Sequence, residues 1–299
     1  MKGSVVGVVI VIAAFLALAV SAAPTMGSKH TAMTVSGFQT PESVLYDPRA
    51  DVYLVANING NPTGTDGNGF ISRVSPSGRV LALKWIDGTR QGVTLNAPKG
   101  MALSGTTLYV ADITAVRMFD RSTGRFKGSV DVPGATFIND VAAGRDGRVY
   151  VTDSGWKPDF SASGTDAVYR IDAGGKVTEL AKGTDLNNPN GITVLPDGSI
   201  LVVAGNAKAE GYILSPDGQR KGVRKMPAAQ LDGVEPLPGG GYLVSSWATQ
   251  TVYRVSRDGM AKAVVQNMKA PADIGYDSRR NRVLVPMFMD NKLVIHPLR

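Results

Sequence analysis

One hairpin pattern recurs six times along this chain, and it restricts the folds that the chain can adopt. An apolar run, a polar turn and a second apolar run follow each other in PESVLYDPRADVYLVA, PKGMALSGTTLYVA, INDVAAGRDGRVYVT, PNGITVLPDGSILVV, LDGVEPLPGGGYLVS and PADIGYDSRRNRVLV. The runs are typical of strands and the turns of tight hairpins. The copies begin at Pro41, Pro98, Ile138, Pro189, Leu231 and Pro271, so the spacings are 57, 40, 51, 42 and 40 residues.

Spacings of this size are typical of a four-stranded propeller blade with loop insertions. An isolated hairpin cannot bury its apolar faces, and packing the copies around an axis leaves few open strand edges. The pattern therefore predicts an all-β fold, a six-bladed β-propeller with four antiparallel strands per blade, as a single domain over residues 31–299. The last copy has room for only three strands, so we expect the last blade to be closed by the N-terminal strand, within residues 31–38.

The first 30 residues have a different composition. A lysine at position 2, an apolar run over residues 5–20 and the small residues Ser21, Ala22 and Ala23 are the parts of a secretory signal peptide. We expect a signal peptide over residues 1–23, followed by a polar tether over 24–30; a retained membrane anchor is the alternative. The chain has no cysteine, and export without disulfides suits both a bacterial periplasm and the outside of the cell. The predicted localisation is periplasmic or secreted.

The formal net charge of +7 does not predict nucleic-acid binding, because lysines and arginines are scattered among acidic residues without a basic run. The short basic cluster over residues 220–225 is interpreted as a solvated edge strand. We expect a monomer that acts on a small molecule, with no nucleic-acid partner and no membrane contact after signal cleavage.

The second position of the six copies carries the chemistry. It lies just before the first expected strand of each blade and contains Glu42, Lys99, Asn139, Asn190, Asp232 and Ala272. The first strand of a propeller blade lines the axis, so these side chains should converge at one end of a central tunnel. Two carboxylates and two amides offer oxygen ligands, which suit calcium or magnesium, and manganese or zinc less selectively. Alternatively, Asn and Asp at this position serve only as turn and cap residues.

The order of these residues resembles the SMP-30/gluconolactonase/LRE-like family of six-bladed propellers. The resemblance rests on a Glu in the first blade, an Asn in the third, the PNG of the fourth and the DG of the fifth, and it covers essentially the whole chain after the N-terminal segment. It implies that Glu42, Asn190 and Asp232 hold a divalent metal, most readily calcium. It also implies that Asp232 is the general base and that Asn139 is a metal ligand or a substrate contact.

Lys99 places a cation among these oxygens. It either pairs with Glu42, binds an anionic substrate, or indicates that the metal is absent. The two histidines of the chain, His30 and His296, are not placed to activate a nucleophile or a water. Hydrolysis at this ring would therefore be metal-assisted, with a ring carboxylate taking the proton of water and Lys99 or Asn139 stabilising the oxyanion.

Two insertions, Asn59–Gly69 and Gly155–Asp166, interrupt the repeat and are candidates for recognition loops. We predict that Trp156 of the second insertion contacts the substrate together with Asn139 and its neighbour Asp140. The resulting hypothesis is a secreted, metal-dependent hydrolase acting on a lactone or ester of a small polar, sugar-like molecule.

Hairpins such as LYVAD and VYVTDSG also resemble NHL-type propellers, which mainly bind partners. This resemblance implies the alternative function, a non-catalytic propeller that binds a ligand or a protein partner on its loop face. Asp112 and Asp153, at the ends of these strands, are interpreted as loop caps.

Overall fold

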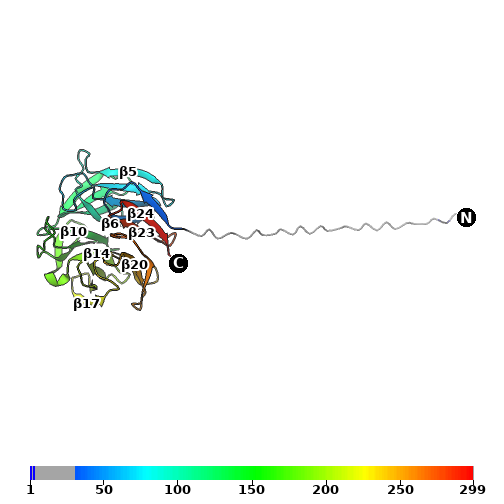
Figure 1. Cartoon of the computed structure of the whole chain (residues 1–299). Helices are drawn as coiled ribbons and strands as arrows, with labels where there is room; N and C mark the ends of the chain where they lie inside the picture. Colours follow the sequence, from blue (N-terminus) through cyan, green and yellow to red (C-terminus); the bar gives the residue numbers. More distant parts are fainter. Residues whose placement is uncertain (2, 4–30, 299) are drawn as a thin grey trace. The chain divides into compact units, whose positions relative to one another are not determined.

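The computed structural model describes residues 1, 3 and 31–298, and residues 31–298 form six antiparallel sheets of four strands each. Each sheet is one blade, and the blades follow one another around a ring in the order of the sequence colours (Figure 1). Within these residues the one helical element assigned is a short 3-10 turn at Thr184–Leu186. The fold is thus the predicted all-β, six-bladed propeller.

The strands of each blade run outward from the axis in chain order, except that β1 is the outermost strand of the sixth blade. The innermost strands are β2 (Pro41–Asp47), β6 (Pro98–Ser104), β10 (Ile138–Ala143), β14 (Pro189–Val194), β18 (Leu231–Pro236) and β22 (Gly275–Asp277). The second strands are β3 (Val52–Asn57), β7 (Thr107–Asp112), β11 (Val149–Asp153), β15 (Ile200–Ala204), β19 (Tyr242–Ser246) and β23 (Arg282–Met287). The third strands are β4 (Phe70–Val74), β8 (Ala115–Asp120), β12 (Ala167–Ile171), β16 (Glu210–Leu214), β20 (Thr251–Val255) and β24 (Lys292–Pro297). The outermost strands are β5 (Val80–Asp87), β9 (Phe126–Asp131), β13 (Val177–Lys182), β17 (Arg220–Lys225), β21 (Ala261–Val265) and β1 (Met33–Ser36).

The N-terminal strand completes the sixth blade, as the sequence predicts. β1 pairs antiparallel with β24 along its whole length. Backbone hydrogen bonds also join β2 of the first blade to the segment directly before β22 of the sixth, since Asp273 N donates to Glu42 O at 2.9 Å and Val44 N donates to Asp273 O at 3.2 Å. Closure therefore leaves no open strand edge between the two ends of the propeller.

The hydrophobic core consists of clusters that each lie between two neighbouring blades. One cluster joins Val35 of β1 and Leu293 of β24 to Tyr53 of β3, and corresponding clusters lie between the other blades. Burying one such Val or Leu side chain contributes about 1.5–3 kcal/mol. Because each blade buries its two faces against different neighbours, the ring folds as a unit and holds the innermost strands around one axis.

The outer strand β17 is exposed at every residue, which confirms the interpretation of the basic cluster at 220–225 as a solvated edge strand. The predicted signal peptide and tether, residues 1–30, lie outside the described residues except for residues 1 and 3. In the described part of the chain, no helix has the length and hydrophobicity needed to cross a membrane.

Candidate functional site

The five polar ring residues lie within the innermost strands, as their second residues, and not just before them as the sequence suggested, whereas Ala272 does precede β22. In the second to fifth blades the pairing with the second strand shifts register between Pro98 and Met101, Ile138 and Val141, Pro189 and Ile192, and Leu231 and Val234. The first blade has a similar shift between Pro41 and Ser43. Such a β-bulge interrupts the pairing and changes the direction of the side chain. The repeated bulge therefore explains why equivalent side chains turn into the tunnel.

The structure brings the five polar ring residues into one cavity of about 240 Å³, lined among others by Glu42, Lys99, Asn139, Asn190 and Asp232. They come from five successive blades. In a six-bladed ring the first blade is opposite the fourth and the second is opposite the fifth. Glu42 therefore lies across the axis from Asn190, and Lys99 lies across it from Asp232.

Glu42 and Asp232 are buried carboxylates with unused oxygens. Their exposed fractions are 6% and 5%, and neither Glu42 Oε2 nor Asp232 Oδ1 has a hydrogen-bond partner. Burial raises the pKa of Glu42 well above its usual range, and the charge of Asp232 adds to this rise. Burial, followed by the charge of Asp273, raises the pKa of Asp232 in the same way. The indole N–H of Trp247 lies near enough to oppose that rise, but its geometry falls short of a hydrogen bond.

Lys99 does not pair with Glu42. Its Nζ donates to Ala97 O at 3.0 Å and lies 4.4 Å from the ring centroid of Phe137. None of the ion pairs within residues 31–298 joins Lys99 to Glu42. Burial lowers the pKa of Lys99 to about 8, although Glu42 and Asp112 both favour its charged form. The Lys99 ammonium thus lines the cavity without an ion-pair partner within residues 31–298.

Asn139 is held by Ser154 of its own blade, which in turn is bonded to the next blade. Its Nδ2 donates to Ser154 Oγ at 3.0 Å, and Ser154 Oγ donates to Pro189 O at 2.7 Å. This chain of hydrogen bonds links the third blade to the start of β14 in the fourth. With the amide nitrogen engaged, the Asn139 carbonyl oxygen is the atom best placed to meet a cation or a ligand donor.

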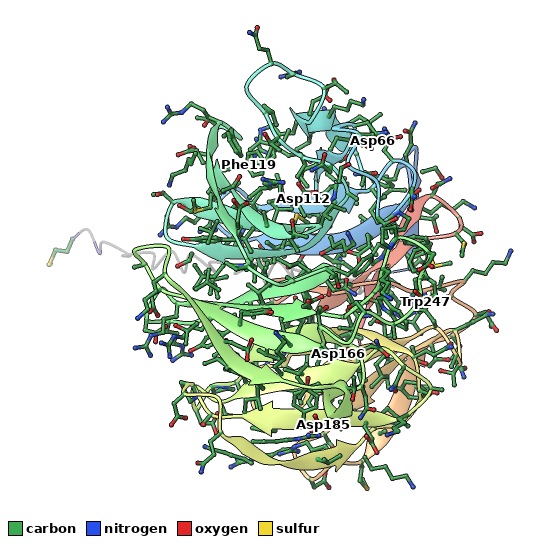
Figure 2. The ribbon with its side chains drawn as sticks, turned by 90° about the vertical axis from the view of Figure 1, so that its left-hand side faces the viewer. Asp66, Asp112, Phe119, Asp166, Asp185 and Trp247 are labelled. Carbon is green, nitrogen blue, oxygen red and sulfur yellow. The ribbon has the colours of Figure 1, made fainter. Side chains whose placement is uncertain are left out.

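Two buried aspartates position the loops beside the ring. Asp153 accepts hydrogen bonds from the backbone N–H groups of Phe137 and Gly155 at 2.9 and 3.0 Å. Asp112, labelled in Figure 2, accepts one from the backbone N–H of Ala97 at 2.8 Å. These contacts confirm the interpretation of both residues as loop caps. They hold Phe137 and Ala97, which are the two groups that contact the Lys99 ammonium.

Asp140 does not reach the ring cavity. Its Oδ2 accepts from Ile192 N at 2.8 Å and its Oδ1 from Val141 N at 2.7 Å. It lines a second cavity, further along the innermost strands, together with Glu235 and Asp273. Successive side chains of a strand point in different directions, so Asn139 and Asp140 do not face one ligand. The predicted substrate contact by Asp140 is thus separated from the other predicted site residues.

A sequence model of the SMP-30/Gluconolactonase/LRE-like region matches residues 71–274, which is more than half of the chain. The chain belongs to this family. The resemblance inferred from the ring residues is thereby confirmed. A comparison with curated proteins found no significant match.

The propeller is similar to several solved structures. A gluconolactonase from Xanthomonas campestris is 18% identical with a TM-score of 0.68, covering 90% of this chain and 89% of that one. A virginiamycin B lyase from Staphylococcus aureus is 14% identical with a TM-score of 0.65, covering 90% of this chain and 99% of that one. A streptogramin B lyase is 13% identical with a TM-score of 0.62, covering 90% and 97%. At these identities the similarity shows a shared fold.

In this member of the SMP-30/gluconolactonase/LRE-like family, aromatic side chains surround the ring cavity. Trp156, the predicted substrate contact, lines it, and so does Phe160 of the same insertion. Phe137, Trp247 (Figure 2) and Phe288 also line it, although the sequence did not single them out.

A repeated position in the sequence could have revealed two of them. The residues that directly follow the six second strands are Ile58, Ile113, Ser154, Gly205, Trp247 and Phe288, and four of these line the cavity. In the first five blades the end of the second strand pairs with the start of the innermost strand, and in the sixth Met287 bridges Pro271, so this position lies at the same end of the tunnel as the ring.

The donor set of this family member fits a hard divalent cation. Within residues 31–298, no group of three His, Cys, Asp or Glu side chains gathers to hold a metal. The ring instead combines two carboxylates with amide oxygens. The unpartnered oxygens of Glu42 and Asp232 lack a positive partner, and Asn190 lines the same cavity as a third oxygen donor. Oxygen ligands of this kind suit calcium or magnesium.

Proposed function

We propose that this protein is an exported, metal-dependent hydrolase that opens a lactone or cleaves an ester of a small molecule. The observation that carries the proposal is the pair of buried, unpartnered oxygens, Glu42 Oε2 and Asp232 Oδ1, in one cavity at the axis. Membership of a family whose description includes gluconolactonase supports the reaction class. A small polar, sugar-like lactone such as gluconolactone is the first substrate to assay.

Glu42, Asn190 and Asp232 would hold the cation, with calcium the first candidate and magnesium, manganese or zinc the alternatives. A bound divalent cation polarises a substrate carbonyl and favours ionisation of water. Asp232 takes one proton from the attacking water as the water oxygen bonds to the carbonyl carbon. The carbon–oxygen bond of the lactone or ester then breaks, and Asp232 returns the proton to the leaving oxygen. The Lys99 ammonium stabilises the negative carbonyl oxygen in between.

A lyase is the other reaction represented among the similar structures. The inactive form of the virginiamycin B lyase, solved with quinupristin, carries alanine in place of a histidine. Within residues 31–298 the one histidine is His296 in β24, and it does not line the ring cavity. A reaction that needs an imidazole in the cavity has no candidate in this part of the chain, which favours hydrolysis. The family match does not favour the non-catalytic NHL-type alternative.

The test is a measurement of metal content and turnover. Protein purified without chelator should contain about one divalent cation per chain and hydrolyse a member of a lactone and ester panel. Asp232→Ala should lower kcat at least about 100-fold, as loss of a catalytic group does in other enzymes. Asp197→Ala, in a turn distant from the ring, is the matched control. Protein that binds no metal and turns over no panel member, even after metal addition, would contradict the proposal.

Export is tested separately. Expression of the full chain in a bacterial host should give periplasmic or secreted protein whose mass lacks the first 22 or 23 residues. An intact N-terminus on protein retained in the cytoplasm would contradict export without affecting the hydrolase proposal.

A further inference from the structure

The ring cavity has a polar floor and aromatic walls. On one side are Phe137, directly before β10, and Trp156 and Phe160 of the third blade. On the other side are Trp247 of the fifth blade and Phe288 of the sixth. The third and sixth blades are opposite in a ring of six, so the two aromatic groups face each other across the axis above the ring residues.

Each wall is built from aromatic side chains in contact. The ring centroids of Phe137 and Phe160 are 6.3 Å apart, and those of Trp247 and Phe288 are 5.3 Å apart. Phe160 is 51% exposed and has a positive φ of 59°, a costly conformation for a residue other than glycine. The third-blade wall therefore presents apolar surface to solvent through Phe160, whereas Phe137 behind it is buried.

The two insertions meet at this cavity. Thr63 Oγ1 of the first insertion donates to Pro158 O of the second at 3.4 Å, and Pro62 lines the cavity together with Trp156 and Phe160. The loops that interrupt the repeat thus extend the apolar wall above the ring. A ligand that reaches the ring carboxylates has to pass these surfaces.

Polar groups are scarce above the floor. Among the described lining residues, the polar side-chain groups outside the ring are Gln230 and the indole N–H groups of Trp156 and Trp247. A sugar lactone would find few hydrogen-bond partners for its hydroxyl groups between these walls, and each hydroxyl buried without a partner costs about 1–3 kcal/mol. An aromatic group has no such cost, and it gains both burial and ring–ring contacts.

We propose that the cavity selects a lactone or ester that carries an aromatic ring. The aromatic ring lies between the third-blade wall and the wall of Trp247 and Phe288, and the reacting carbonyl lies at Asp232 and Lys99. The inference rests on the proposed hydrolase function, and it places the substrate in a different class from the sugar-like molecule expected from the resemblance.

Three six-membered lactones and one ether test the inference with the full chain in the presence of calcium. The lactones are 3-isochromanone, which has a fused benzene ring and an alkoxide leaving group, δ-valerolactone, which has neither ring nor hydroxyls, and gluconolactone. Isochroman, the ether that corresponds to 3-isochromanone, cannot be hydrolysed and reports binding alone by calorimetry.

The value of kcat/KM for 3-isochromanone should exceed those of the other two lactones by about 10-fold or more, as expected from one aromatic contact. Trp247→Ala and the solvent-exposed Phe160→Ala should each raise the ratio of KM for 3-isochromanone to KM for δ-valerolactone by roughly 3- to 10-fold. Trp85→Ala is the matched control. Trp85 lies on the outermost strand of the first blade, away from the cavity, and packs against Arg73 of the neighbouring strand. This substitution should change none of these constants.

The outcomes separate the two proposals. Faster hydrolysis of gluconolactone than of 3-isochromanone, with no effect of Trp247→Ala, overturns the aromatic selection and leaves the hydrolase standing. If no lactone is hydrolysed with any of the four metals, the hydrolase fails. In that case, if isochroman binds to the wild-type protein but not to Trp247→Ala, the cavity still takes an aromatic ligand. If isochroman does not bind to the wild-type protein, the inference is overturned as well.

Discussion

Replacing Asp232 with asparagine should stabilise the metal-free protein at alkaline pH while it abolishes turnover. Asp232 is 5% exposed, and its Oδ1 has no partner. Because burial raises its pKa, the folded protein binds this proton more tightly than the unfolded chain does. Proton binding by Asp232 therefore stabilises the folded protein fully below the unfolded-state pKa of about 3.9, and this contribution is lost as pH rises through the raised pKa of the folded state. Asparagine carries no charge to desolvate and avoids this loss.

The gain expected for Asp232→Asn is about 1–3 kcal/mol at pH 8 without metal, because the buried carboxylate there lacks compensation. In a domain of this size, one kcal/mol corresponds to a change of about 2–4 °C in Tm, so Tm should rise by about 2–12 °C. Near pH 4 the carboxyl group of the wild-type protein is protonated in the folded state, and the gain should disappear. Calcium should raise the Tm of the wild-type protein and have a smaller effect on the variant.

Thermal unfolding followed by circular dichroism, in chelator at pH 4 and pH 8, measures this difference. Asp153→Asn is the matched control, because the Asp153 carboxylate accepts hydrogen bonds from the backbone N–H groups of Thr136, Phe137 and Gly155 at 2.9–3.0 Å. Replacing the Asp153 carboxylate in this control variant should lower the free energy of unfolding by about 1–3 kcal/mol at pH 8. The reasoning is refuted if Asp232→Asn melts below the wild-type protein at pH 8, or if it gains equally at both pH values.

Three further predictions address catalysis, packing and closure. The kcat should rise with pH as the buried carboxylates ionise and fall above about pH 8 as Lys99 loses its proton. The Lys99→Met variant should lack the fall of kcat at alkaline pH. A pH profile of kcat that is the same in this variant as in the wild-type protein contradicts the role of Lys99. Gly191→Ala should lower the free energy of unfolding in urea by about 1–3 kcal/mol, because the Cβ of the alanine would lie 2.1 Å from a backbone oxygen of β18. The Cβ added by Gly174→Ala would meet no atom within 4 Å, so this variant should be as stable as the wild-type protein. Equal midpoints for the two glycine variants would exclude this steric argument. Val35→Asp, at the buried position of β1, should lower the free energy of unfolding by about 3 kcal/mol and promote aggregation by opening the sixth blade. Thr34→Asp, at an exposed position of the same strand, should do neither. Equal light scattering from the two variants contradicts the closure by β1.

The sequence by itself determined the architecture of this protein and the polar composition of its ring. Local patterning is sufficient for this, because a strand–turn–strand repeat of blade length can bury both of its faces only against further copies. It also placed Glu42, Asn190 and Asp232 at equivalent positions, so their convergence followed from the symmetry of the ring. The missing strand of the last copy similarly indicated closure by residues near Val35.

The tertiary structure alone decided which side chains share the cavity. A β-bulge turns Asn139 into the ring cavity and leaves Asp140 at the second one, and a one-residue difference in direction cannot be derived from the hydrophobic pattern. Lys99 contacts Phe137 and Ala97, not Glu42, because capped loops from outside the repeat bring those groups to its ammonium. The aromatic walls come from loops in different blades, and such contacts depend on how the blades are placed around the axis and not on any local periodicity.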